Sequence, residues 1–251
     1  LTQSDSVLDP AKDIFDSIMG ASSHFTINSW FKSSTQPATA TTYFNEKYLD
    51  FADETSNQFF KMGTVAQFND SDNFFFRRLL DSWTISWWMK VPSGGWNSSD
   101  SYANPDYIFH TGCDTVWEGF FANQRDGELW LHIGKTGSVI GIAKYDATGW
   151  DDGSWHHYAV TYNGPALVSA GESALATHLK VYRDGAAVTG VGVDYGAWLT
   201  QAGEDIDTGS TGEFTFGYPN FSYESHSAAI ASYGDIAIWK TDLSSVQISN
   251  I

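Results

Sequence analysis

The sequence is short of cysteine and of positive charge. It has one cysteine, Cys113, among 251 residues, so no internal disulfide can form and a domain must be stabilised by its core. Lys and Arg number 13 against 30 Asp and Glu, which gives a formal net charge of −17. Such a surface repels nucleic acid and anionic membranes and favours cations such as Ca²⁺. We therefore expect no nucleic-acid partner.

Long apolar runs are also missing. No segment approaches the roughly 18 apolar residues that a membrane helix needs, so no membrane insertion is expected. Aromatic residues are abundant instead, with 11 Trp, 12 Tyr and 17 Phe in a chain that is 42% hydrophobic. A single domain of this size can bury a large core, and Cys113 fits in such a core as a small apolar residue.

The first part of the chain differs from the rest. Apolar residues between Ala11 and Met19 recur at helical spacing and stop at Gly20, which predicts a short helix. A Ser/Thr/Ala-rich stretch at 33–42 then predicts a linker. We therefore predict an N-terminal arm of residues 1–42.

From residue 43 to 251 the pattern changes to short aromatic and β-branched runs separated by Gly, Asn, Asp and Ser. This spacing is typical of antiparallel all-β folds and predicts about ten strands with almost no helix. The predicted strands are Tyr48–Phe51, Phe59–Met62, Trp83–Val91, Tyr107–Thr111, Gly119–Asn123, Glu128–Ile133, His156–Tyr162, His178–Arg183, Glu213–Gly217 and Tyr233–Lys240.

Alternation and turn residues sharpen this prediction. In the segment Trp83–Val91 the odd positions are apolar, so they are predicted to face the core. The pairs Asp126-Gly127 and Asp184-Gly185 supply the positive φ angles of two-residue turns. Each pair therefore predicts a β hairpin.

The segments Asp152–Tyr162 and Leu179–Gly185 carry the most specific motifs, and Trp83–Lys90 and Gly234–Trp239 keep the same order around them. Together they resemble the laminin-G-like, concanavalin-A-like jelly-roll family. The resemblance implies an all-β, antiparallel jelly-roll sandwich over residues 43–251.

The chain departs from this family at two places. Ala52-Asp53 stands where the family often has Asp-Gly after the opening strand, and the link at Gly164–Thr177 is longer than usual. We interpret the long link as a surface excursion, which either has a role of its own or has none.

The resemblance also implies a structural calcium ion. Asp235 matches a position that coordinates calcium in many related sandwiches, and Asp50 and Asp53 lie near the opening strand, where further oxygen ligands are expected. The alternative is that Asp235 only caps a turn.

The sequence gives less support to an enzymatic function. Adjacent strand residues such as His156 and His157 point to opposite faces, so one ion or one substrate cannot easily engage both, and a structural role is expected. The Glu residues are dispersed, with no closely spaced acidic pair of the glycosidase type. Glu118 and Asp126 could still approach each other across a hairpin.

Glycan binding needs exposed aromatic faces and polar groups for the sugar hydroxyls. At least half of the 11 Trp are expected to be core, and Trp96 and Trp198 are the best candidates for exposure. The candidate ligand-binding residues are Trp96, Tyr102, Trp117, Trp150, Trp198 and Tyr223, with Tyr218 and Phe221 in similar loops.

Two functions stay open at this point. The first is a non-catalytic, calcium-supported carbohydrate-binding or adhesion domain that acts at an extracellular, cell or virion surface. The second is a structural or decoration domain of a virion, fibre or filament, which contacts other subunits through residues 1–42. Fold alone does not choose between them.

Overall fold

The computed structural model describes residues 49–51, 59–64, 81–96, 106–111, 119–135, 138–194, 213–217 and 227–251. The predicted arm at 1–42 lies outside the described residues, so the division of the chain at residue 42 stays a prediction. Over the described ranges the chain is mostly strand, and the strands form two sheets. The predicted all-β sandwich is confirmed.

The first sheet has six strands and contains both the first and the last strand of the described chain. Its spatial order is β1 (Leu49–Phe51), β14 (Ala231–Trp239), β3 (Ser82–Lys90), β8 (Trp155–Asn163), β9 (Leu179–Arg183) and β10 (Ala186–Ala187).

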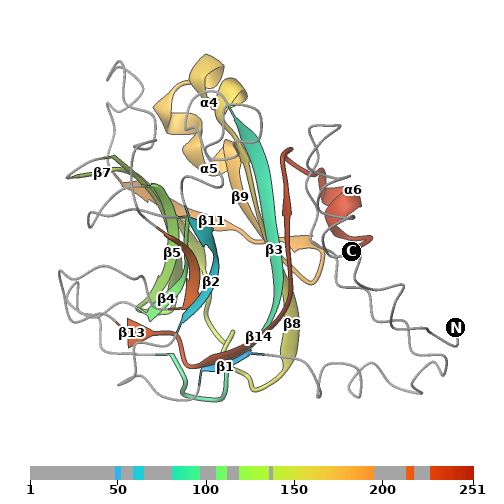
Figure 1. Ribbon diagram of the computed structural model, residues 1–251. Helices are drawn as coiled ribbons and strands as arrows, with labels where there is room; N and C mark the ends of the chain where they lie inside the picture. Colours follow the sequence, from blue (N-terminus) through green and yellow to red (C-terminus); the bar gives the residue numbers. More distant parts are fainter. Residues whose placement is uncertain are drawn as a thin grey trace, which may run out of the picture.

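The second sheet has eight strands and faces the first (Figure 1). Its order is β11 (Gly190–Asp194), β7 (Ser138–Asp146), β6 (Glu128–Lys135), β5 (Gly119–Arg125), β4 (Asp106–His110), β12 (Glu213–Gly217) and β2 (Phe59–Thr64), and β13 (Ser227–Ala228) pairs with β4. The β13–β4 pairing is parallel and the other described pairings are antiparallel. These sheets fit a jelly-roll-like β sandwich.

The core between the sheets follows the predicted alternation. On β3 and just after it, the apolar side chains buried in the core are Trp83, Ile85, Trp87, Met89 and Val91. The Trp83 ring meets Phe120 of the opposite sheet edge-on, with 4.9 Å between ring centroids. Trp87 meets Phe109 in the same way at 5.6 Å. Large aromatic side chains from both sheets therefore interdigitate, which supports a core without disulfides.

Both predicted Asp-Gly hairpins are confirmed. Asp126 and Gly127 join β5 to β6 with φ angles of 53° and 76°, and Asp184 and Gly185 join β9 to β10 with 50° and 78°. Positive φ at both central residues is the geometry that matches the twist of the flanking strands.

The segment predicted as a surface excursion contains helical turns that were not predicted: α4 (Gly164–Ala170), η2 (Glu172–Ala174) and α5 (Leu175–His178). Asn163 caps α4, because its side-chain oxygen accepts the Ala166 N–H, and Pro165 stands in the first turn. Strands β7, β10, β11 and β13 were also not predicted.

A further short helix, α6 (Ser245–Ile248), follows β14. It lies beyond the six-stranded sheet on the side away from the eight-stranded one, where Ile248 packs on Ala159 and Tyr182 (Figure 1). Among the described residues, none of the helices has the length and apolar character needed to cross a bilayer.

Candidate functional site

Two of the predicted glycan-binding aromatics are buried. Trp96 and Trp150 have exposed fractions of 7% and 4%, so their predicted exposure is wrong. A tight turn in which the Gly95 N–H donates to the Pro92 carbonyl folds the Trp96 loop back, and the two indoles pack at 5.8 Å. The other candidates, Tyr102, Trp117, Trp198, Tyr218, Phe221 and Tyr223, lie outside the described residues.

The predicted calcium ligands are only partly described. Asp235 has a φ of 43°, is exposed, and has a raised pKa because its surroundings desolvate the carboxyl group. Asp50 lies on β1, where its backbone pairs with Ser232, and Asp53 lies outside the described residues. No group of three potential metal ligands occurs within the described ranges. The calcium ion stays a prediction.

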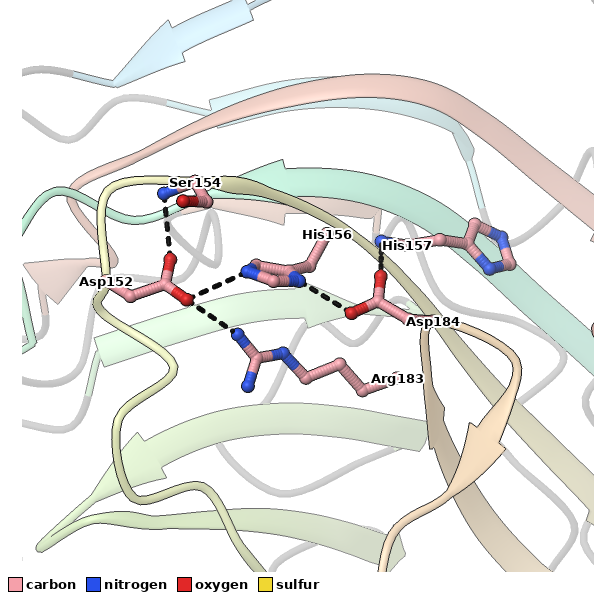
Figure 2. Close-up of polar contacts among 6 residues, drawn as sticks. All are labelled: Asp152, Ser154, His156, His157, Arg183 and Asp184. Carbon is pink, nitrogen blue, oxygen red and sulfur yellow. Dashed lines mark hydrogen bonds and ion pairs between the residues drawn. The ribbon is translucent and has the colours of Figure 1, made fainter. Parts of the chain in front are cut away.

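Four polar side chains form a hairpin network at the β9–β10 turn: Asp152, His156, Arg183 and Asp184 (Figure 2). His156 lies between the two carboxylates, with Nε2 at 2.9 Å from Asp152 and Nδ1 at 2.6 Å from Asp184. Both contacts are hydrogen bonds only when the imidazole carries a proton on each nitrogen. Arg183 adds a bond from Nη2 to Asp152 at 3.1 Å.

Every carboxylate oxygen of Asp152 and Asp184 has a hydrogen-bond partner. The remaining oxygen of Asp152 accepts the Ser154 N–H at 2.8 Å, and that of Asp184 accepts the His157 N–H at 3.0 Å. Although burial opposes it, hydrogen bonds from Ser154 and His156 and the charge of Arg183 hold the pKa of Asp152 below its usual range. The network therefore fixes the turn to the loop before β8, and the predicted structural role of His156 agrees with this geometry.

The outer face of the eight-stranded sheet, which points away from the core, carries a different polar group that we call the outer grid. It consists of Arg125, Asn123 and Phe121 on β5, Glu128, Trp130 and His132 on β6, and Asp146, Lys144 and Ile142 on β7. Strand register aligns these residues in three rows: Arg125–Glu128–Asp146, Asn123–Trp130–Lys144 and Phe121–His132–Ile142. The residues between them, such as Phe120, Leu131 and Tyr145, belong to the core.

Trp130 is the centre of the grid, and its ring is held by charged neighbours. The indole N–H donates to Glu128 Oε2 at 2.8 Å. The Lys144 ammonium lies 4.0 Å from the ring centroid, and the Arg125 guanidinium lies 4.9 Å from it. Two cations therefore meet on one indole of a strongly acidic protein, at distances where cation–π attraction acts.

His132 stacks beside this ring. Its imidazole is nearly parallel to Phe121, with 4.3 Å between centroids, and Phe121 stacks in turn on His110 at 5.1 Å. Burial lowers the pKa of His132 well below its usual value, and Arg125, His110 and Lys144 lower it further. His132 Nδ1 is buried and has no hydrogen-bond partner among the described residues. An orphaned buried donor costs about 1–3 kcal/mol.

Sequence reasoning missed the outer grid. The signal was present in Glu128–Ile133, where polar or aromatic residues alternate with Leu129, Leu131 and Ile133. Alternation shows that Glu128, Trp130 and His132 share a face, but it does not show which strands flank them. Strand β7, which contributes Lys144, was itself not predicted.

No protein-family model matches the chain, and no curated protein matches it. Solved structures with a similar course of the chain include the binding domain of botulinum neurotoxin DC in complex with SialylT, at TM-score 0.43 and 13% identity over 68% of this chain and 34% of that one. A structure of botulinum neurotoxin type C, described in connection with its interaction with two ganglioside molecules, has TM-score 0.44 and 14% identity over 69% and 35%. The receptor-binding domain of botulinum neurotoxin D has TM-score 0.42 and 14% identity over 71% and 38%. The chain spans about a third of the length of these structures.

Proposed function

We propose that this protein is a non-catalytic glycan-binding domain, on a jelly roll of the laminin-G-like or concanavalin-A-like kind, and that its outer grid is the binding site. The observation that carries the proposal is Trp130, an indole fixed by Glu128 and covered by the Lys144 ammonium. A fixed aromatic ring among hydrogen-bonding side chains is the combination that recognises sugars.

Trp130 has an exposed fraction of 7%, so the proposal requires a side chain over its ring to move aside for the sugar. Lys144 is that side chain, because its ammonium lies over the ring and its long stem is only half-buried. The apolar face of a sugar ring then takes its place on Trp130. The displaced ammonium and the half-buried Glu128 carboxylate are positioned to hydrogen-bond the sugar hydroxyls.

Binding is favoured over hydrolysis by the carboxyl groups of the grid. Glu128 and Asp146 are directly opposite each other on β6 and β7, but a glycosidase needs one of two such groups to stay protonated. Hydrogen bonds from the Thr148 N–H and hydroxyl hold the pKa of Asp146 below its usual value. Asp235, a carboxyl group whose pKa is raised, lies on the other sheet.

A glycan-array screen followed by calorimetry on the best ligand tests the proposal. Trp130→Ala should weaken binding at least about tenfold, because the stacking surface is lost. Phe60→Ala, an exposed aromatic on the edge strand β2, is the matched control and should bind like the wild type. A melting curve of each variant checks that the fold is kept.

Two results would contradict the proposal. One is the absence of any glycan ligand, which would favour a structural or decoration role. The other is equal binding by the Trp130 and Phe60 variants, which would move the site away from the grid.

The proposal has two further parts. One is that the domain acts at an extracellular, cell or virion surface, where glycans are presented. The other is that calcium supports the fold at Asp235, whose desolvated carboxyl group gains from a nearby cation.

A further inference from the structure

A chain of two hydrogen bonds fixes the tautomer of His132. Arg125 Nε donates to Asn123 Oδ1 at 3.2 Å, and this bond sets the orientation of the Asn123 amide. Asn123 Nδ2, which can only donate, then lies 3.2 Å from His132 Nε2. Nε2 must therefore accept, so the proton of the neutral imidazole resides on Nδ1.

This arrangement leaves one donor without an acceptor. His132 has an exposed fraction of 2%, and within the described residues nothing accepts a hydrogen bond from Nδ1. Buried donors nearly always have a partner, from the protein, from water or from a ligand. The next row of the grid brings the Lys144 ammonium, and Arg125 lies beyond Asn123 on β5.

We propose that the row of His132 is a subsite for an anionic oxygen group of the ligand, a carboxylate or a sulfate. One oxygen of this group accepts the His132 Nδ1–H, and the positive charges of Lys144 and Arg125 stabilise it. This inference rests on the proposed function, because it takes the ligand of the grid to be a glycan and names it as an acidic one.

The charges of the grid also orient such a ligand. Glu128 and Asp146 stand together in the row nearest the β5–β6 turn, and His132 lies two rows away. Arg125 shares the first row, but its side chain reaches into the second, where it bonds Asn123 and lies over Trp130. Like charges repel, so the anionic group is excluded from the turn end and favoured at the His132 end. Neutral hydroxyls of the same ligand are left for Glu128.

The first test uses inorganic sulfate and needs no glycan. The His132 Nδ1–H signal is followed by NMR during a sulfate titration, with chloride at matched ionic strength as the reference. We expect a saturable shift with sulfate only. His132→Phe keeps the ring stack on Phe121 but has no ring N–H, and His178→Phe on α5 is the matched control.

The second test compares galacturonic-acid and galactose oligosaccharides of equal length, which differ only in the carboxylate. The wild type should prefer the acidic ligand by about tenfold or more, because a hydrogen bond to a charged group is being added. His132→Phe should remove the preference. His132→Asn, which can still donate near the Nδ1 position, should retain part of it.

The outcomes separate the two proposals. Equal binding of both oligosaccharides, with no effect of sulfate on Nδ1–H, overturns the anionic subsite and leaves glycan binding intact. A sulfate effect without binding of any oligosaccharide overturns the proposed function and supports the subsite. If neither sulfate nor oligosaccharide acts, both proposals are overturned.

Discussion

The hairpin network and the outer grid both gather charged and imidazole side chains, but they differ in how their hydrogen bonds are used. In the network, both nitrogens of His156 and all four carboxylate oxygens of Asp152 and Asp184 have partners, and the groups reach solvent. In the grid, His132 is buried and one of its nitrogens has no partner among the described residues.

This difference assigns the two clusters different roles. In the hairpin network the imidazole and both carboxylates are satisfied, Arg183 Nε is buried without a partner among the described residues, and the cluster contributes mainly to the geometry of the backbone. A buried donor without an acceptor destabilises the fold, because its desolvation is not compensated by a hydrogen bond. A ligand that supplies the acceptor removes this cost. Variants that change one cluster should therefore affect stability, and variants of the other should affect binding.

The largest expected effect is a loss of protein stability when the hairpin network is disrupted. Asp184→Ala removes the acceptors for the His156 ring and the His157 N–H and places Ala at a φ of 50°. We expect a loss of about 2–3 kcal/mol in the free energy of unfolding, measured by urea denaturation.

Asp126→Ala is the control for this variant. It makes the same change at the matching turn between β5 and β6, where φ is 53°, and so reports the backbone cost alone. Equal losses in the two variants would show that the network itself contributes nothing to stability.

The second effect is a pH dependence that originates in the grid. The pKa of His132 is lowered by burial, whereas in the unfolded chain it is near the ordinary value of about 6.5. Below that pH the unfolded state binds a proton that the folded state does not. The free energy of unfolding should therefore be constant above about pH 6.5 and fall below it, by at most about 1.4 kcal/mol per pH unit for this residue.

Burial also lowers the pKa of His157, so this residue should add to the loss of stability at low pH. Melting temperatures between pH 5 and 7.5 test this, and His132→Phe should reduce the slope. An unchanged slope in that variant would mean that His132 is not the group responsible.

The smallest effect concerns Asp235, whose carboxyl group is desolvated. Its raised pKa means that the charged form is disfavoured in the fold, so Asp235→Asn should be neutral or slightly stabilising near pH 7 without calcium. With millimolar calcium the wild type should melt higher, because a ligand of the folded state stabilises it. Asp235→Asn should lose that increase while Asp126→Asn keeps it. Identical melting of the wild type with calcium and with chelator would rule out the ion.

Sequence patterns were sufficient for the strands whose two faces differ. Ten predicted strands and both Asp-Gly turns are present, because alternation and positive φ are local requirements. Strand β7 was missed because Ser138–Asp146 contains Gly141 and does not alternate cleanly. The turns of α4 and α5 were missed although Asn163 and Pro165 are ordinary signals of a helix start.

Exposure could not be predicted in the same way. Trp96 sits in a Gly/Ser-rich stretch that reads as open loop, yet the turn at Gly95 and a bond from the Gly94 N–H to Asp151 hold the loop against the sandwich. The grid depends on β5, β6 and β7 being neighbours, which is a property of sheet order. A site built from side chains of several strands therefore cannot be predicted until the order of the strands is known.

The position of β14 has a consequence for the synthesis of the protein. This strand is inserted between β1 and β3, which leave the ribosome long before it, so the six-stranded sheet cannot close until β14 has been synthesised. Until then β3 offers an unpaired edge to other nascent chains. Agents that shield strand edges during translation should therefore raise the yield of native protein.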